Sequence, residues 1–359
     1  MKSRIETSRS RPSSSNSHCN DIRHAGRVPL RQISTNRLQH AQNQKKVLSP
    51  ANNPAPTQRE YVHPEPFVHK EVPIGDIEDP QDIVEFEHVI YRTLRAEENA
   101  ASALEFNQNE ITLKDRDLLI DAICRFHYKL GLMTNTLYRF IGIFDRYLAV
   151  GQVPKSKLKL YGCAAFLIAS KIEDIYPAQS TDLITLSEKA FTQRELFAAE
   201  IHIINAIGFE TTFATPLFYL TQFMRINGDP KEIRDVKETR EMREIREAKE
   251  AREAKIAILF ARYILEICQS NGKFYGVKPA LEASLAVFVT RIMQGKSNVW
   301  PEALEGYTQF TVEDLTPYAN IVKGMLMQED REETKFMRRK YGSDLFLNVA
   351  HWEIPSTWI

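Results

Sequence analysis

The segment from Leu158 to Ile172 constrains the fold of this chain more than any other. It reads LKLYGCAAFLIASKI, in which apolar or small residues fill nearly every position beyond the first turn. A helix that is apolar on all its faces has to be surrounded by other helices. Lys171 lies in its last turn, and a second apolar helix, expected from Thr192 to Ile207, carries Glu200. Charges on such helices must find partners or stay at a rim, and the partner of such a charge can belong to another protein.

Amphipathic periodicity predicts two consecutive sets of helices, which is typical of a duplicated all-α unit. No segment alternates polar and apolar residues over the length of a strand, so the expected fold class is all-α, with two tandem five-helix domains. The first set is expected near Lys114–Tyr128, Asn135–Val150, Leu158–Ile172, Thr181–Lys189 and Thr192–Ile207. The second set is expected near Pro216–Arg225, Ile256–Ser270, Pro279–Gln294, Val312–Met327 and Asp330–Lys340.

Local patterns add detail to the first set. Thr192 and Glu195 have the spacing of a capping box, and Gly208 is expected to close the same helix. A further amphipathic helix is predicted ahead of the set from apolar residues at helical spacing, namely Ile83, Phe86, Ile90 and Leu94. In the helix near Lys114–Tyr128 the residues expected to point inward are Leu118, Leu119, Ala122, Ile123 and Phe126.

Composition divides the chain into three parts. Residues 1–78 are rich in Ser, Asn, Gln, Pro and Arg and cannot bury enough apolar surface to offset chain entropy. We therefore expect a disordered tail over 1–78, a first domain over 79–213 and a second over 214–359. The tail is basic, because residues 1–50 hold ten Lys or Arg against two acids.

The second domain contains an unusual charged segment at 231–255. It repeats Arg-Glu-x, and its apolar residues fall at every third position, a period that drifts around a helix and builds no continuous stripe. We expect a solvated helical extension of the helix near Ile256–Ser270. The alternative is a helix that binds a partner.

Cysteine usage and hydropathy exclude several classes of protein. Four cysteines stand at 19, 124, 163 and 268 without a CxxC pair, so no zinc site or redox pair is expected. No apolar run is as long as a membrane span, and the N-terminus lacks the apolar core of a signal peptide. No phosphate loop, metal cluster or nucleophile–base pattern stands out. The sequence thus predicts a soluble intracellular protein that is not an enzyme, with no cofactor, no metal, no membrane and no direct nucleic acid.

Several motifs, taken in order, carry a family resemblance. They are Arg116-Asp117-Leu118-Leu119-Ile120-Asp121, Phe144-Asp145-Arg146-Tyr147-Leu148, Lys157-Leu158-Lys159-Leu160-Tyr161-Gly162, Ala169-Ser170-Lys171-Ile172-Glu173-Asp174-Ile175-Tyr176-Pro177, Phe191-Thr192 and Arg339-Lys340-Tyr341-Gly342-Ser343. Together they resemble the cyclin box of mitotic B-type cyclins. The match extends from about Asp82 to Ala350, and Lys171 and Glu200 stand 29 positions apart, as that family's pair does.

The resemblance implies a regulatory subunit that binds and activates a cyclin-dependent protein kinase to control the cell cycle at G2/M and mitosis, in the nucleus and cytoplasm. Three alternatives remain open. The first is a cyclin-box transcription factor that bridges DNA and polymerase, which would carry a zinc ribbon and a basic face. The second is a transcriptional cyclin, and the third is a degenerate cyclin that packs without activating.

The resemblance also implies roles for individual residues. The expected kinase-binding residues are Lys171, Glu200, Ile172, Phe209, Phe86 and Ile90. In the family, the Lys and Glu bond to kinase backbone beside its regulatory helix. Arg116 and Asp145 match a pair that bridges the first two helices internally, so a structural ion pair is expected there.

The family's docking patch for Arg-x-Leu peptides is altered in this chain. Its positions here are Asp115, Leu119, Ala122, Arg125 and Lys159. A large apolar wall is replaced by Ala122, and two cations stand where a peptide arginine would approach. We expect weak or altered docking of such peptides.

The tail contains a degron-like motif. Arg27, Leu30 and Ile33 match the destruction box of mitotic cyclins, although Thr35 stands where the family has Asn. The Arg-x-x-Leu pattern alone is weak, but this copy lies in a segment expected to be extended and accessible, as a captured peptide must be. The partner that it implies is a ubiquitin ligase recognising the destruction box.

Overall fold

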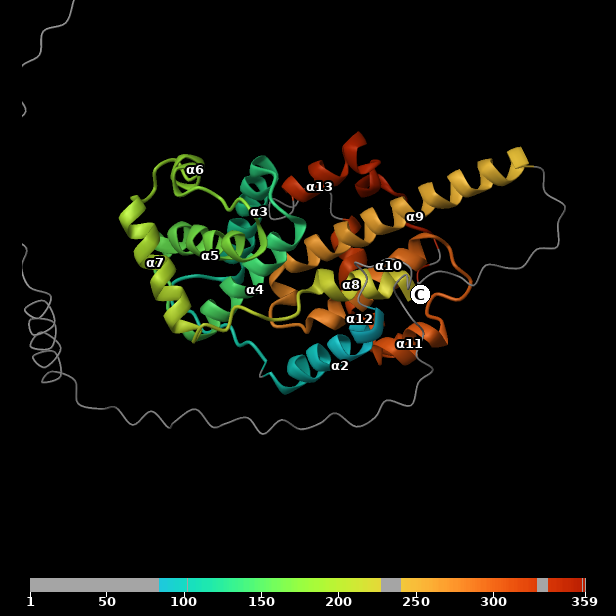
Figure 1. Ribbon diagram of the computed structural model, residues 1–359, viewed down its shortest axis with the longest axis horizontal. Helices are drawn as coiled ribbons and strands as arrows, with labels where there is room; N and C mark the ends of the chain where they lie inside the picture. Colours follow the sequence, from blue (N-terminus) through green and yellow to red (C-terminus); the bar gives the residue numbers. More distant parts are fainter. Residues whose placement is uncertain (1–83, 102, 227–239, 328–334, 357, 359) are drawn as a thin grey trace, which may run out of the picture. The chain divides into compact units, whose positions relative to one another are not determined.

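The chain is built from helices over every part that the computed structural model describes, which comprises residues 84–101, 103–226, 240–327, 335–356 and 358 (Figure 1). A leading helix, α2, spans Val84–Ala100. The first repeat contains α3 (Leu113–Leu130), α4 (Thr134–Val150), the short 3₁₀ turn η1 (Lys155–Lys157), α5 (Leu158–Glu173), α6 (Ser180–Leu186) and α7 (Gln193–Ala206). No strand occurs in these ranges, so the expected all-α class is confirmed.

The second repeat contains α8 (Pro216–Ile226), α9 (Arg240–Gln269), η2 (Gly272–Phe274), α10 (Pro279–Met293), α11 (Glu302–Thr308) and α12 (Val312–Met327). It is followed by α13 (Lys335–Tyr341), η4 (Asp344–Phe346) and η5 (Val349–His351). The short α11 was not predicted, and it completes this set of five. The helix expected near Asp330–Lys340 is therefore α13, which lies outside the set and packs on α3 and α9.

The α5 helix forms the centre of the first repeat. It packs against α3, α4 and α7, and its middle, from Cys163 to Ala169, is buried on every side. The capping box at Thr192 and Glu195 is confirmed, with each side chain bonded to the backbone of the other residue. In the second repeat α10 has the corresponding place, because it packs against α8, α9 and α12 with almost every side chain buried.

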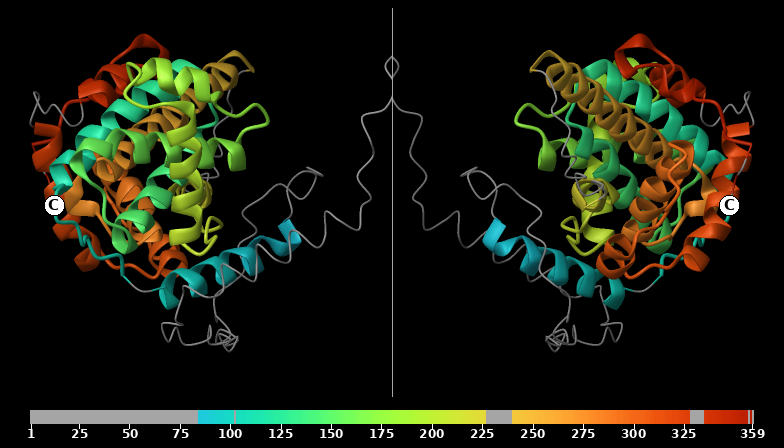
Figure 2. Two further views of the ribbon diagram at one scale, coloured as in Figure 1. Left: turned by 90° about the vertical axis from the view of Figure 1, so that its left-hand side faces the viewer. Right: turned by 90° about the vertical axis from the view of Figure 1, so that its right-hand side faces the viewer.

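The α2 helix packs on the second repeat rather than on the first (Figures 1 and 2). Tyr91 donates its hydroxyl proton to the carbonyl oxygen of Tyr307 on α11 at 3.0 Å, and the two rings stack. The backbone N–H of Ala280 donates to the Glu98 carboxylate at 2.8 Å, at the start of α10. These contacts tie α2 to helices that lie far from it in the sequence.

One buried arginine joins the two repeats. The Arg116 guanidinium on α3 donates through Nε and Nη2 to the two carboxylate oxygens of Asp145 on α4, at 2.7 and 2.6 Å. Its Nη2 also donates to the carbonyl oxygen of Gln269, at the end of α9, at 3.1 Å. Burial by itself would lower the pKa of Arg116, but the adjacent carboxylates of Asp145 and Asp117 outweigh burial and raise it.

The neighbours of this arginine bridge the repeats as well. The backbone N–H of Gly272 donates to the Asp117 carboxylate at 2.9 Å. Tyr275, whose ring stacks on the Arg116 guanidinium, donates its hydroxyl proton to the carbonyl oxygen of Asp145 at 2.9 Å. The ion pair expected between two helices of one domain is thus also a junction between both domains.

One detail of the predicted packing was wrong. Leu118 was expected to face inward, but it is 38% exposed, and Ile120 is buried in its place. On α2, Leu94 of the predicted apolar stripe packs on the core together with Tyr91, whereas Phe86 and Ile90 of the same stripe are exposed. Helical spacing identifies an apolar stripe but does not say which of two stripes a neighbouring helix covers.

Over the described residues, the structure has neither a membrane-spanning helix nor a metal-binding cluster. No helix there has the length and apolar character required to cross a bilayer. Over the same residues, no three or more His, Cys, Asp or Glu side chains are grouped so that they could hold a metal ion.

The buried arginine gives a direct stability prediction. Replacing Arg116 by Met should lower the free energy of unfolding by about 3–5 kcal/mol, because two buried carboxylates lose their counter-charge. Chemical denaturation followed by circular dichroism measures this change. The matched control, Lys249→Met in an exposed pair of α9, should change stability by less than about 0.5 kcal/mol. Equal small changes in both variants would contradict a structural role for the pair.

Candidate functional site

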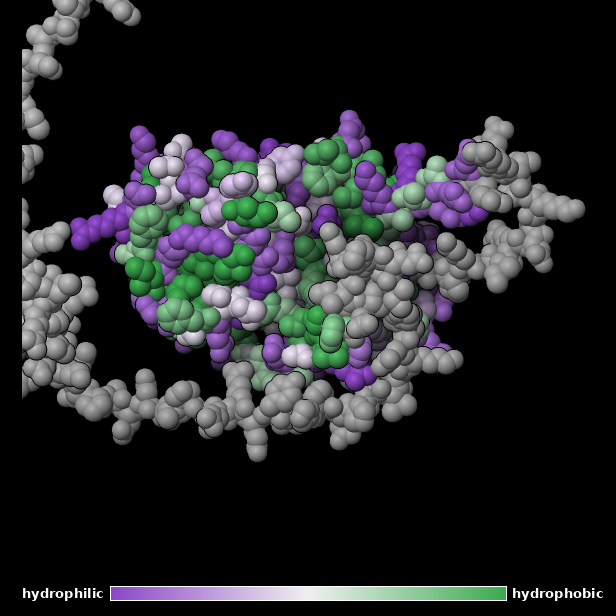
Figure 3. All heavy atoms as spheres, viewed as in Figure 1, coloured by the Kyte–Doolittle hydropathy of each residue, from purple (hydrophilic) through white to green (hydrophobic). Residues whose placement is uncertain are grey.

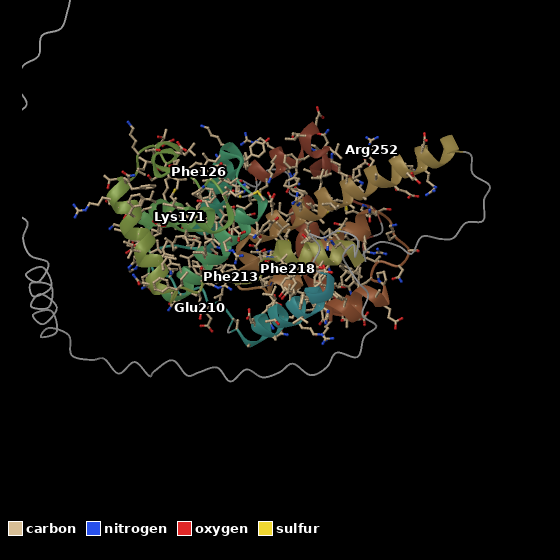
Figure 4. All side chains as sticks on the ribbon, viewed as in Figure 1. Phe126, Lys171, Glu210, Phe213, Phe218 and Arg252 are labelled. Carbon is tan, nitrogen blue, oxygen red and sulfur yellow. The ribbon has the colours of Figure 1, made fainter. Side chains whose placement is uncertain are left out.

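Lys171 and Glu200 meet across two helices at the surface of the first repeat. The Lys171 ammonium at the end of α5 forms a salt bridge with Oε1 of Glu200 on α7. The Lys171 side chain remains 47% exposed and that of Glu200 17% exposed. Figure 4 labels Lys171 on α5 beside α7. The two groups are therefore paired with each other and still open to a further partner.

The end of α5 is anchored on both sides of Lys171. Ser170 is fully buried, and its hydroxyl donates to the carbonyl oxygen of Leu167 and accepts the N–H of Ala178. The Glu173 carboxylate accepts from Arg139 Nε and Asn135 Nδ2, both at 2.6 Å. These bonds hold the chain around Lys171 in one conformation, so Lys171 has less conformational entropy to lose when it binds a partner.

Asp174 completes this anchor at the start of α4. Its carboxylate accepts the backbone N–H of Met133 at 2.7 Å and the hydroxyl of Thr136 at 2.6 Å. The acidic pair that follows Lys171 in the sequence therefore fixes the helix end and is not free to pair with the lysine. Lys171 reaches Glu200 on α7 instead.

Arg139 extends the anchor to the linker that follows α7. It donates through Nη1 to the carbonyl oxygens of Thr211 and Phe213, at 3.1 and 2.6 Å, and stacks on the Phe213 ring. The Arg146 guanidinium lies over the same ring, 3.6 Å from its centroid. The Phe213 ring also occupies the place where a side chain at Gly142 would begin. The linker is thereby held on α4, as the labelled Phe213 in Figure 4 illustrates.

Phe209 has a strained backbone at the start of this linker. Its φ is +63°, in the left-handed region, and it follows Gly208, whose φ is also +63°. A bulky residue in this conformation is an outlier, since the left-handed region costs roughly 1–2 kcal/mol per non-glycine residue. The Phe209 side chain is nevertheless 70% exposed, so burial of the ring does not offset that cost. Strain of this kind persists mainly at functional sites.

Several apolar side chains on α5 and α7, or just beyond the ends of these helices, are exposed. Ile172 and Phe209, both expected at this site, are exposed, and so are several residues that the sequence analysis did not single out: Phe197, Ile201, Ile175 and Tyr176. Figure 3 shows apolar and hydrophilic side chains interleaved over α5 and α7, at the left of the view. We name this set, together with Lys171 and Glu200, the α5–α7 face. Single exposed apolar residues are ordinary, but such a group marks an interaction surface.

The additional residues have a recognisable signal in the sequence. Along α7, Leu196, Ala199 and Ile203 are buried and form the core stripe. Phe197 and Ile201 form a second apolar stripe, on either side of Glu200, that faces solvent. An amphipathic helix on a globular surface needs only one such stripe. A second stripe at helical spacing around a charged residue could therefore have indicated them.

The remaining expected site residues lie elsewhere. Phe86 and Ile90 are exposed on α2, next to exposed Val89. The expected docking positions lie on α3 and α5, where Leu119 is buried and Arg125 forms an ion pair with Asp121. Asp115 caps α3 and forms an ion pair with Lys155 at 2.9 Å, while Lys159 and, in part, Ala122 are open to solvent. The degron-like residues Arg27, Leu30 and Ile33 lie outside the described residues.

Family models match both repeats of the chain. The N-terminal cyclin domain matches residues 79–212 and the C-terminal cyclin domain matches residues 214–355. A viral cyclin structure from herpesvirus saimiri superimposes with a TM-score of 0.52 at 21% identity, over 66% of this chain and 95% of that one. At that identity the likeness supports the fold alone.

Curated relatives agree with the family models. G2/mitotic-specific cyclin S13-7 of Glycine max is 28% identical over 254 residues, which are 70% of this chain and 90% of that protein. G2/mitotic-specific cyclin S13-6 of the same plant is 27% identical over 273 residues, 76% of this chain but 55% of the relative. G2/mitotic-specific cyclin-B of Dictyostelium discoideum is 27% identical over 287 residues, 79% of this chain and 60% of the relative.

The two matched domains cover most of the chain. The described residues have the all-helical fold that the sequence predicts. Cyclin domains are non-catalytic regulatory domains, so the two matched domains are regulatory. By its fold, its paired domains and its relatives, this protein belongs to the cyclin family.

Proposed function

We propose that this chain binds and activates a cyclin-dependent kinase through the α5–α7 face, and that it acts at G2/M and in mitosis. The observation that supports the proposal is the Lys171–Glu200 pair, which is formed and open to solvent on helices that also carry exposed apolar side chains. A specific protein interface typically combines an apolar centre with polar groups at its edge.

The pair has bonding capacity left for a partner backbone. An ammonium group has three N–H donors, and one of them is used by Glu200. A carboxylate has about four acceptor sites, so Glu200 can accept a backbone N–H while it holds the lysine. Because α5 ends in a fixed position, little side-chain entropy remains to be lost on binding. The pair can therefore bind the backbone of a kinase segment without depending on that segment's side chains.

Activation would follow from holding the regulatory helix of the kinase. That helix carries a Glu that must pair with an active-site Lys before phosphoryl transfer is fast. A cyclin surface that binds only the active arrangement shifts the kinase population toward it. Ile172 and Phe209 would supply the apolar centre of the contact, and the exposed Phe86 and Ile90 would add contacts from α2.

The relatives support the cell-cycle stage that we propose. Those with printed specificity are G2/mitotic-specific cyclins from plants, an amoeba and molluscs. A cyclin-box transcription factor or a transcriptional cyclin is less well supported by this set. We place the work of the protein in the nucleus and cytoplasm, where mitotic kinases act.

Removing the charged pair tests the proposed contact. In the double variant Lys171→Ala with Glu200→Ala, recovery of the kinase with the protein and the associated histone H1 kinase activity should fall at least tenfold, since a desolvated charge pair at an interface contributes a few kcal/mol. Co-precipitation from mitotic cells and a phosphotransfer assay measure both quantities.

A matched control separates this effect from a general change of charge. Lys249 and Glu253 form an i,i+4 pair on the exposed part of α9, with an N–O distance of 3.8 Å. The double variant Lys249→Ala with Glu253→Ala should recover kinase as the unmodified chain does. Normal kinase recovery by the Lys171/Glu200 variant would refute the assignment.

The strained Phe209 gives a prediction in which stability and binding change in opposite directions. Asn tolerates the left-handed region far better than Phe, and the exposed ring contributes little to packing. Phe209→Asn should therefore leave the free energy of unfolding unchanged or raise it by up to about 1 kcal/mol. Kinase affinity should fall at least tenfold, as expected for an aromatic anchor.

Thermal unfolding and titration calorimetry with a purified kinase measure the two effects. A marked loss of stability would show that the Phe209 ring has a structural role. The variant Phe209→Leu keeps an apolar group in the strained backbone, and it should retain more affinity than Phe209→Asn without the gain in stability.

We further propose that a ubiquitin ligase recognises the degron-like motif at Arg27, Leu30 and Ile33. The support is the motif itself, in a segment whose composition favours an extended, accessible chain. Replacing Arg27 and Leu30 by Ala should lengthen the half-life of the protein through mitotic exit severalfold, as measured by a cycloheximide chase in synchronised cells. An unchanged half-life would exclude this motif as the degron.

A further inference from the structure

The α9 helix has two parts with different surroundings. It packs on α8, α10 and α13, and the buried side chains described in it all lie from Ala257 onward. Residues 240–255 precede this part and extend the same helix by about 24 Å. All side chains described there, at 244 and 246–255, are exposed. We name residues 240–255 the charged arm; Figure 1 shows it reaching beyond the other helices, and Figure 4 labels Arg252 on it.

The charged arm is exposed on every side, because the exposed residues 246–255 are consecutive and make up nearly three turns. A helix that is polar all round is stabilised by many i,i+4 ion pairs, bridges two domains through solvent, or is not stable by itself. Arg246 pairs with Glu250 at 2.9 Å and Lys249 with Glu253 at 3.8 Å. In both pairs the basic residue comes first, which is the weaker orientation, so these pairs add little to the stability of the arm.

Like charges form continuous rows along the charged arm. The cations recur every three residues, at 246, 249, 252 and 255, and the Glu residues follow the same period at 244, 247, 250 and 253. Residues three apart are neighbours on a helix surface, so each row places like charges next to each other. A second helix that brought the opposite sign to both rows would relieve this repulsion. Ala248, Ala251 and Ala254 occupy positions between the rows and allow such a helix to approach closely.

The period of three makes the charged arm complementary to a reversed copy of itself. If two arms run antiparallel with Lys249 of one opposite Glu250 of the other, every position directly opposite matches. The matched pairs are Glu244–Lys255, Arg246–Glu253, Glu247–Arg252, Ala248–Ala251 and Lys249–Glu250. Registers shifted by three residues keep the pattern, but this one overlaps residues 244–255 in full.

No parallel arrangement has this property. In register, like charge meets like charge along the whole arm. A shift of one residue places cations opposite Glu, but it also places Glu opposite Ala and Ala opposite cations. Charges along a helix pair select its orientation, so the sequence favours the antiparallel one.

We propose that the charged arm pairs in antiparallel orientation with the same arm of a second copy of this chain. Such a pair is two-fold symmetric, so it closes at two copies. Residues 244–255 carry four cations and four Glu, so two arms do not repel each other at long range. A partner of one charge sign, such as nucleic acid or an acidic membrane, would match one row and be repelled by the other. The reversed copy matches both.

Pairing leaves the α5–α7 face open. The charged arm belongs to the second repeat, and Figure 1 shows it at the opposite end of the described body from α7. The dimer would thus present two α5–α7 faces. Kinase recovery is measured separately through Lys171 and Glu200, so failure of the pairing leaves that assignment untouched.

Charge reversal in the full chain tests the pairing. The acidic variant has Arg246→Glu, Lys249→Glu and Arg252→Glu. The basic variant has Glu247→Lys, Glu250→Lys and Glu253→Lys. Because exposed ion pairs are individually weak and are screened by salt, sedimentation velocity should detect dimers of the unmodified chain at about 100 µM protein in about 50 mM salt. Each variant alone should associate at least tenfold more weakly, and an equimolar mixture of the two should associate as the unmodified chain does.

A variant with unchanged net charge tests the orientation. It makes the first half of the arm acidic and the second half basic, through Arg246→Glu, Lys249→Glu, Glu250→Lys and Glu253→Lys. In an antiparallel pair the acidic half of one arm lies opposite the basic half of the other, so this variant should associate at least as tightly as the unmodified chain. A parallel pair would bring like charges together and would be lost.

A control on the first repeat separates the arm from net charge. The variant Lys129→Glu, Lys157→Glu and Lys159→Glu changes exposed cations by the same total as the acidic variant does and should sediment as the unmodified chain does. The proposal fails if the unmodified chain is monomeric under these conditions, which is also the result expected if the arm binds another protein or stays single. It fails as well if the acidic variant dimerises normally, if mixing restores nothing, or if the variant with divided charges no longer associates.

Discussion

A single buried guanidinium determines how the two cyclin repeats fit together. Arg116 uses its donors on Asp145, on Asp117 and on the carbonyl oxygen of Gln269 at the end of α9, and it is almost fully buried. A buried charge is tolerated only when every hydrogen-bonding group is satisfied. The two repeats therefore have one arrangement in which this residue is stable. The α2 helix packs on the second repeat, while α5 and α7 belong to the first. By joining the two repeats, Arg116 therefore also fixes the surfaces proposed for the kinase relative to each other.

The α5–α7 face is presented by a rigid support. Glu173 and Asp174 fix the end of α5 on α4, and Arg139 fixes the linker after α7 on the same helix. The exposed groups of the face thus depend on buried bonds around α4, which itself makes none of the proposed contacts. This arrangement lowers the entropy cost of binding, because the groups of the face are already ordered in the folded protein.

Much of this structure could be predicted from local sequence patterns. The apolar character of α5, the capping box of α7 and the spacing of Lys171 and Glu200 each depend on residues within one or two helices. The features that escaped prediction depend on contacts between distant segments. Arg116 reaches a carbonyl 153 positions away, α11 spans 7 residues without a clear stripe, and the choice between Phe86 and Tyr91 on α2 is made by the second repeat. The left-handed backbone at Phe209 is likewise set by its surroundings and not by its own preference.

Gly142 is a further example of a site feature that depends on a contact between distant segments. The ring of Phe213 rests on this glycine, and both arginines that clamp the ring come from α4. Any side chain at position 142 would displace the ring and, with it, the stretch of chain that carries Phe209. A genetic screen for lost partner recognition would consequently recover substitutions at this half-buried position, although Gly142 itself lies outside the α5–α7 face.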